Sequence, residues 1–406
     1  MKKCMQRLIQ IFLILSLVSS LFVGCTSSQQ TENTDDQITV YVSGTSEQMY
    51  KIVEVANQWS EENGAIPVKV VSGSGDANSY IQSSDKRPDI YWGLSAADTE
   101  KLVKTNSVDK VPDGLYSDDD FVSKDLVDAV SFNKVKYGIP VFQDTVALFY
   151  NKDKVTEVPK TMEDLIEQAK SVGFTTEIDN KFFNYGFIAA NGGYIFKNND
   201  GVFDDNDLGV NNAGAIKGYK FIQDLVRQDK LMIAGTTDMM AEYNFQSGQD
   251  AFYIGESGRI RTFNTSGKVN FGVTTIPSLG GQEVKPLKSV NMAVVNSEST
   301  KKEQSWKLLK YIIDNSSEYI MGQNPKAPVL KASLDTDTFK NDDNIKALYQ
   351  QSLHATLMPN TIAGEALNTA IDNTMASLTL GFITPEECGV EIEKNIKEAV
   401  KVADPN

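Results

Sequence analysis

Short runs of β-branched and aromatic residues alternate with amphipathic stretches along the chain from Ile38 onward. The run at 38–44 predicts a strand, and residues 47–63 predict a helix that ends at Gly64. Further strands are predicted at 68–71, 89–92, 138–141, 146–151, 251–254, 269–276 and 292–295. This alternation is typical of an α/β fold with a largely parallel sheet.

Helical patterns separate these strands and dominate after about residue 300. Thr161 is placed to cap a helix, with Asp164 three residues later in the capping-box position, and Pro385 opens the last predicted helix. Helices are predicted at 96–104, 162–172, 213–228, 303–314, 344–354, 361–380 and 385–402. The chain shows no internal repeat of 20–50 residues.

The first 24 residues have the pattern of an export signal. Lys2, Lys3 and Arg7 precede an apolar stretch at 8–23, which is shorter than the roughly 20 apolar residues of a membrane span. Gly24-Cys25 ends this stretch and resembles the cleavage site of bacterial lipoprotein signals. The resemblance implies that residues 1–24 are removed and that Cys25 carries a diacylglycerol anchor. An uncleaved anchor helix is the alternative.

Residues 26–37 contain no hydrophobic side chain, so residues 25–37 are predicted to form a flexible tether. The remaining chain is long enough for about two domains of ordinary size.

The composition of the chain argues against several classes of function. The 406 residues carry a formal net charge of −15, with 39 basic and 54 acidic side chains, which argues against a nucleic-acid partner. One histidine and three cysteines leave little material for metal sites or for Ser-His and Cys-His catalysis. We therefore predict no metal, no cofactor and no enzymatic activity. Cys388 has no basic neighbour to activate it, so a packing role is expected.

One aromatic segment is a candidate for ligand contact. Phe182, Phe183 and Tyr185 follow one another closely within 181–185, and aromatic faces stack on the C–H faces of sugar rings. Core packing is the simpler interpretation of this segment taken alone.

Seven ordered motifs resemble the maltose/maltodextrin-binding protein family, the solute-binding subunits of carbohydrate ABC importers. They are LFYNKD at 148–153, VPKTMEDL at 158–165, IAANGGYIFK at 188–197, LGVNNAGAIKG at 208–218, FQSGQDAFYI at 245–254, GKVNFGVTTIP at 267–277 and LMPN at 357–360. The resemblance is dense from Asp144 to about Ser299 and thinner over the rest of the chain.

The resemblance implies an α/β, two-lobed periplasmic-binding-protein-like (type II) fold with a ligand cleft between the lobes. The first lobe is expected at 38–142 and 292–330, and the second at 146–287 and 334–402. Hinge segments are expected near 143–145, 288–291 and 331–333.

The resemblance also assigns ligand-binding candidates. Asp144 matches a cleft Glu of the family, and Asn180, Phe182 and Phe183 fall in its sugar-binding run. Trp92 lies one place from a stacking Trp of the family. We add Tyr185 as a further stacking residue.

Glu256 and Arg259 stand where the family has a Gly-Pro-Trp loop. They either contact a sugar or form a surface ion pair. Two of the family's three stacking Trp positions are occupied here by Gly258 and Asn368, so the ligand is either a maltodextrin or another glycan.

The resemblance thus implies a monomeric lipoprotein on the outer face of the cell membrane, or in the periplasm of a Gram-negative organism. It would bind an oligosaccharide and deliver it to ABC transporter permease subunits. A non-sugar solute, an exported glycosidase and an adhesion lipoprotein are the alternatives.

Overall fold

The computed structural model describes residues 36–72, 87–359 and 362–403, and the described residues from Ile38 onward belong to one compact unit. The proposed signal at 1–24, the lipid site Cys25 and most of the tether lie outside the described residues. Within the described part of the chain, no helix is long and apolar enough to cross a membrane.

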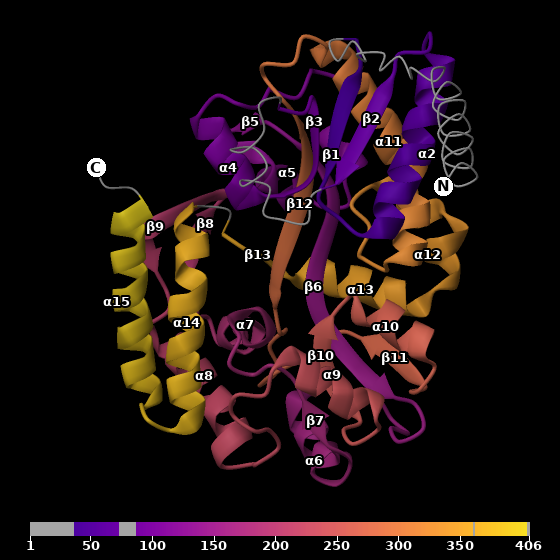
Figure 1. The fold of residues 1–406 in the computed structure, drawn as a ribbon. Coiled ribbons are helices and arrows are strands. Elements are labelled where there is room, and N and C mark those ends of the chain that lie inside the picture. Colours follow the sequence, from indigo (N-terminus) through magenta and orange to yellow (C-terminus); the bar gives the residue numbers. More distant parts are fainter. Residues whose placement is uncertain (1–35, 73–86, 360–361, 404–406) are drawn as a thin grey trace, which may run out of the picture. The chain divides into compact units, whose positions relative to one another are not determined.

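The first half of the main sheet consists of the parallel strands β2, β1 and β3 and the antiparallel strand β12 (Figure 1). β1 lies between β2 and β3 and pairs with both in parallel. β12 follows β3 in the sheet and runs antiparallel to it. The strands in sheet order are β2 (Val68–Ser72), β1 (Ile38–Val42), β3 (Ile90–Ser95) and β12 (Leu287–Val295).

The second half of the sheet is built around β6, which pairs with β12 through its first half and with β10 and β11 through its second. β7 lies beyond β10 and is parallel to it. The strands are β6 (Ile139–Asn151), β10 (Phe252–Glu256), β7 (Phe174–Thr175) and β11 (Phe271–Thr274).

The separate strands predicted at 138–141 and 146–151 are wrong, because β6 is one continuous strand of 13 residues. The polar residues Gln143, Asp144 and Thr145 interrupt the apolar pattern in the sequence. Their backbones nevertheless pair with residues 288–290 of β12, and the ladder continues to residue 139 of β6 after a register shift between Asn291 and Met292.

Helices flank both halves of the sheet. The helices that surround the first half are α2 (Ser46–Glu62), α4 (Ala96–Lys104), α5 (Lys124–Ala129) and α11 (Lys302–Gln323). Those of the second half are α6 (Met162–Val172), α7 (Lys181–Ala190), α8 (Ala213–Arg227), α9 (Asp238–Gln246), α10 (Arg259–Ser266), α12 (Asp337–Asn341), α13 (Asp343–His354), α14 (Ile362–Leu380) and α15 (Pro385–Ala403).

α14 and α15 pack side by side, as Figure 1 shows.

Smaller elements complete the fold. The remaining elements are β4 (Ser131–Phe132), β5 (Val135–Lys136), β8 (Phe196–Asn199), β9 (Val202–Leu208), β13 (Thr356–Leu357) and two 3₁₀ helices, η1 (Asp118–Asp120) and η2 (Lys331–Asp335).

Two sets of hydrophobic clusters divide the chain nearly as the expected lobes do. Residues from β1, β3, α2 and α11 form one set, and residues from β6, β10, α8 and α15 form the other. Ala327 and Leu357 are exceptions, since each packs with the core of the opposite set. These cores support the expected lobes, whose boundaries and hinge positions remain predictions.

A buried lysine ties the two sets together at β12. The Lys288 side chain is about 1% exposed, and its ammonium group forms an ion pair with Asp125 at the start of α5. The same group donates a 2.9 Å hydrogen bond to the carbonyl oxygen of Ser352 in α13. Burial lowers the pKa of Lys288, while the Asp125 carboxylate acts in the opposite direction. Lys288 therefore connects α5 to α13 through the central strand.

We predict that Lys288→Met destabilises the full chain by about 3 kcal/mol, because it leaves Asp125 and the Ser352 carbonyl without their shared donor. Urea unfolding measures this loss. Adding Asp125→Asn to Lys288→Met should recover part of it. Lys124→Met on the same helix is the control, since Lys124 is 70% exposed in its pair with Asp128 and should cost at most about 0.5 kcal/mol. Equal stability of the two single variants would contradict the prediction.

Candidate functional site

A charged cluster lies where β6 and β10 pair. Glu256 at the end of β10 is opposite Val146, and Asp144 lies two residues earlier on β6. Lys326 forms an ion pair with Asp144. Its ammonium nitrogen lies 3.4 Å from the hydroxyl oxygen of Ser257, next to Glu256. The antiparallel register thus brings two expected site residues, Asp144 and Glu256, together.

Arg259 joins this cluster from the first position of α10. Its guanidinium pairs with Asp238 in the first turn of α9 and lies 2.5 Å from a carboxylate oxygen of Glu242. Asp238 also accepts a hydrogen bond from the buried Tyr253 hydroxyl. The Nε of Arg259 is buried and has no hydrogen-bond partner among the described residues. Arg259 is therefore held in place and keeps one donor unused.

Carboxylates outnumber cations here, and this changes their protonation. Burial raises the pKa of Glu256, and the negative charges of Asp144 and Asp238 raise it further, against the opposing effects of Lys326 and Arg259. Burial also raises the pKa of Glu177, with a contribution from Asp238. Both groups hold a proton at a higher pH than an exposed glutamate would.

Asn180 lies beside the same group of charges. Its side-chain oxygen caps α7 by accepting a 2.9 Å hydrogen bond from the Phe182 backbone, and its amide lies 3.2 Å from Glu177. Glu177 is the hydrogen-bond partner of Asn180, and the negative charge of Asp238 contributes to the raised pKa of Glu177. Asp238 in turn pairs with Arg259, so the two carboxylates lie between Asn180 and Arg259 in this series of interactions.

The expected stacking residues differ in exposure. Phe183 and Tyr185 are each 4% exposed and belong to the core of the second half, and burial raises the pKa of Tyr185 to about 12. Trp92 is 2% exposed and lies in the core of the first half, with no partner for its indole N–H among the described residues. Phe182 is only partly buried. Core packing thus accounts for Phe183, Tyr185 and Trp92, and Phe182 keeps an accessible part of its ring.

An ion pair joins the first half of the molecule to this region. Arg261 of α10 binds Glu47 in the first turn of α2 through two contacts, of 2.9 and 2.5 Å. This hydrogen bonding lowers the pKa of Glu47 to about 2. Both residues are partly exposed, so the contact lies at the edge of the site rather than in a core.

Sequence analysis missed Lys326, Asp238, Glu177 and the Glu47–Arg261 pair. Lys326 is 182 residues from Asp144, so no local spacing could connect them. Asp238 has the pattern of an ordinary first-turn acid next to the cap Thr237. Of these residues, only Glu177 could have been named as a candidate from the sequence, since it stands three places before the candidate Asn180.

The described residues contain no group of three or more His, Cys, Asp or Glu side chains that could hold a metal ion. Cys388 is fully buried in the second half, and burial raises the pKa of its thiol to about 12, in keeping with a packing role.

Comparisons with known proteins show the family of the chain. The model of a family described as bacterial extracellular solute-binding protein matches residues 54–347. A galactooligosaccharide-binding protein of Bacillus subtilis (strain 168) is 27% identical over 323 residues, covering 76% of this chain and 75% of that protein. A maltooligosaccharide ABC transporter solute-binding lipoprotein of Streptococcus pneumoniae (strain ATCC BAA-255 / R6) is 26% identical, covering 95% of each chain.

A solved structure supports the same grouping. The maltose-maltodextrin binding protein of Alicyclobacillus acidocaldarius matches with a TM-score of 0.79 and 25% identity, over 89% of this chain and 100% of that one. The predicted two-lobed α/β fold is thereby confirmed, and so is the family resemblance seen in the sequence motifs. The chain belongs to the family of bacterial extracellular solute-binding proteins.

Proposed function

We propose that the protein is the solute-binding lipoprotein of an ABC importer and that it captures an oligosaccharide between its lobes for delivery to the permease. The observation that carries this proposal is the cluster of Asp144, Glu256, Arg259 and Lys326 beside the strand that passes from one core to the other. Relatives named for maltooligosaccharide and galactooligosaccharide binding support the ligand class.

Sugar hydroxyls match the chemistry of this cluster, since each hydroxyl both donates and accepts a hydrogen bond. Asp144 and Glu256 supply acceptors, and Arg259 supplies the unused Nε donor. Asn180 and the partly buried ring of Phe182 extend the site along the start of α7. We assign these five residues to the ligand and give Trp92, Phe183 and Tyr185 the task of supporting the site from the cores.

The same five residues determine which ligand we expect. Aromatic platforms contribute about 0.5–1.5 kcal/mol each beyond the area they bury. With one partly exposed ring among the assigned residues, polar contacts dominate. A maltooligosaccharide is our first choice, and a different glycan is the second because the charged residues Glu256 and Arg259 stand where the family has a Gly-Pro-Trp loop.

Lobe closure supplies the transport signal. The ion pair between Glu47 and Arg261 connects α2 to α10 and exists only while these helices are close. A ligand that contacts both lobes adds further contacts of this kind and so shifts the population toward the closed form. The permease then recognises that form.

We propose that the protein binds its solute and does not catalyse a reaction on it. The family and the relatives are solute-binding proteins. A glycosidase would need two carboxylates with separate acid and base tasks, and Asp144 is already paired with Lys326. Incubation with oligosaccharides should yield no new reducing ends.

The proposed location follows from the N-terminus. Cys25 carries two acyl chains, which give stable anchoring where one would be marginal. The lipoprotein named among the relatives supports this. We place the protein as a monomer on the outer face of the cell membrane, or in the periplasm if the organism is Gram-negative.

We predict that the full chain, purified in detergent, binds at least one malto- or galactooligosaccharide with a Kd near micromolar, about −8 kcal/mol. Isothermal titration calorimetry measures this, and a ligand-dependent rise in Tm supports it. Asp144→Asn keeps the side-chain shape but removes the charge, and should weaken binding about tenfold or more. Asp113→Asn, at an exposed position, is the matched control. Absence of binding across the sugar panel would refute the proposal.

A second prediction concerns the proton of Glu256. Its raised pKa means that the folded state binds this proton more tightly than the unfolded state, so stability falls as pH rises from the ordinary glutamate value through the raised value. Glu256→Gln removes the titration and should raise Tm by about 2 °C at pH 7, with no gain near pH 4. Differential scanning calorimetry measures both, with Glu54→Gln as the exposed control. An equal gain at both pH values would contradict this assignment.

A third prediction tests the anchor. In bacterial cells supplied with labelled palmitate, the full chain should carry the label and sediment with membranes, and Cys25→Ala should abolish the label. Cys388→Ala is the control, because that thiol is buried and should not affect lipidation. Labelling that persists in Cys25→Ala would rule out Cys25 as the lipid site.

A further inference from the structure

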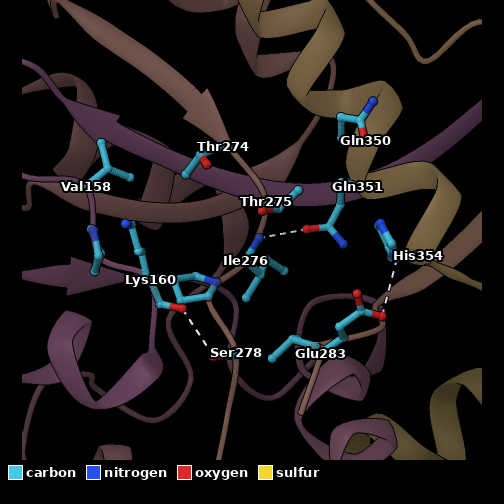
Figure 2. Close-up of a pocket in the computed structure, with 13 residues that line it drawn as sticks. Val158, Lys160, Thr274, Thr275, Ile276, Ser278, Glu283, Gln350, Gln351 and His354 are labelled. Carbon is cyan, nitrogen blue, oxygen red and sulfur yellow. Dashed lines mark hydrogen bonds and ion pairs between the residues drawn. The ribbon is translucent and has the colours of Figure 1, made fainter. Parts of the chain in front are cut away.

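A pocket of about 660 Å³ lies away from the charged cluster and shares no residue with it (Figure 2). Its walls are residues 158–160, the segment 274–278 after β11, residues 283–284 and the last turn of α13. This volume falls within the range of about 300–1,000 Å³ typical of small-molecule sites. The solute site proposed above does not account for this cavity.

A buried amide marks the inner wall of this pocket. Gln351 of α13 is 1% exposed, and its side-chain oxygen accepts a 2.7 Å hydrogen bond from the backbone N–H of Ile276. Its amide nitrogen has no hydrogen-bond partner among the described residues, and Figure 2 shows it pointing away from Ile276 toward the side that carries His354. A ligand oxygen placed at this point would accept a hydrogen bond from this amide.

Opposite charges stand at two separate places on the pocket wall. Lys160 makes no ion pair within the described chain, and its backbone oxygen accepts a hydrogen bond from Ser278. Glu283 lies 3.3 Å from the ring nitrogen of His354, and both side chains are well exposed. The pocket therefore offers a cation, an anion and an amide donor.

The rest of the lining combines apolar side chains with hydroxyl and amide groups. Pro159, Ile276 and Pro277 are buried residues of the wall, and the exposed imidazole of His354 is the one aromatic ring of the lining. A sugar would find no Phe, Tyr or Trp ring on which to stack. A ligand with an aliphatic body and charged ends is the better match.

We propose that this pocket is a second ligand site, which binds a short zwitterionic peptide with aliphatic side chains. The C-terminal carboxylate pairs with Lys160, the first peptide carbonyl accepts from the Gln351 amide, and the N-terminal ammonium pairs with Glu283. Capture of peptide termini by such groups is an established form of recognition, and each charged contact is stronger than a neutral hydrogen bond. The proposal is independent of the oligosaccharide site.

The test uses the dipeptide Leu-Ala with the purified full chain in detergent, followed by isothermal titration calorimetry. We expect saturable binding, weakened about tenfold by Gln351→Glu, which keeps the acceptor for Ile276 but replaces the donor with a negative oxygen. Lys160→Met should weaken binding about fivefold, and Lys152→Met, outside the pocket, should leave it unchanged. N-acetyl-Leu-Ala and Leu-Ala amide, which each lack one terminal charge, should bind more weakly than Leu-Ala.

Two results would overturn the proposal. One is the absence of Leu-Ala binding to the unaltered chain. The other is binding that Gln351→Glu, Lys160→Met and both blocked peptides leave unchanged. Maltotriose is included as a competitor: displacement of Leu-Ala by the sugar would place the peptide in the solute site and also refute the proposal. Loss of sugar binding alone would count against the proposed function and leave the peptide site intact.

Discussion

The antiparallel pairing of β6 with β12 is the constraint on which the rest of the structure depends. β6 pairs with β12 through residues 139–145 and with β10 and β11 through residues 146–151, so one strand contributes to two cores. Any movement of one lobe against the other must bend this pair. The register of each ladder fixes which side chains face one another. Asp144 and Glu256 are neighbours because of the register between β6 and β10.

The buried side chain of Lys288 supports the pair of strands β6 and β12. A buried ammonium is costly unless its charge is paired and its donors are used. Lys288 meets both conditions through Asp125 and the Ser352 carbonyl, which belong to different helices, α5 and α13. The ion pair is therefore a poor source of net stability but a strong source of specificity, since only one arrangement of α5, β12 and α13 satisfies it. We infer that it holds the helices in register while the strands flex.

Most elements could be predicted from the sequence because their apolar periodicity is local. The strands at β1 and β10 and the helices α2, α8, α13 and α15 lie close to their predicted ranges. Local reasoning failed where tertiary contacts overrode a polar interruption. The predicted helix 303–314 extends to Gln323 as α11, because Ile320 and Met321 beyond the polar residues 314–318 are buried. The site was only half predictable: Asp144, Glu256 and Arg259 stood on recognisable motifs, whereas Lys326 reaches Asp144 from a segment far along the chain.

The charge balance of the proposed site limits which solutes it can hold. Asp144, Asp238, Glu242, Glu256 and Glu177 are acidic, whereas the basic partners that contact them are Arg259 and Lys326. An anionic solute would add to this excess of negative charge in a partly desolvated region, where repulsion is weakly screened. A neutral polyhydroxylated solute instead donates hydrogen bonds to the carboxylates and offers an oxygen to the unused Nε of Arg259. The electrostatics of the cluster thus favour a neutral sugar over an acidic one, even though aromatic platforms are few.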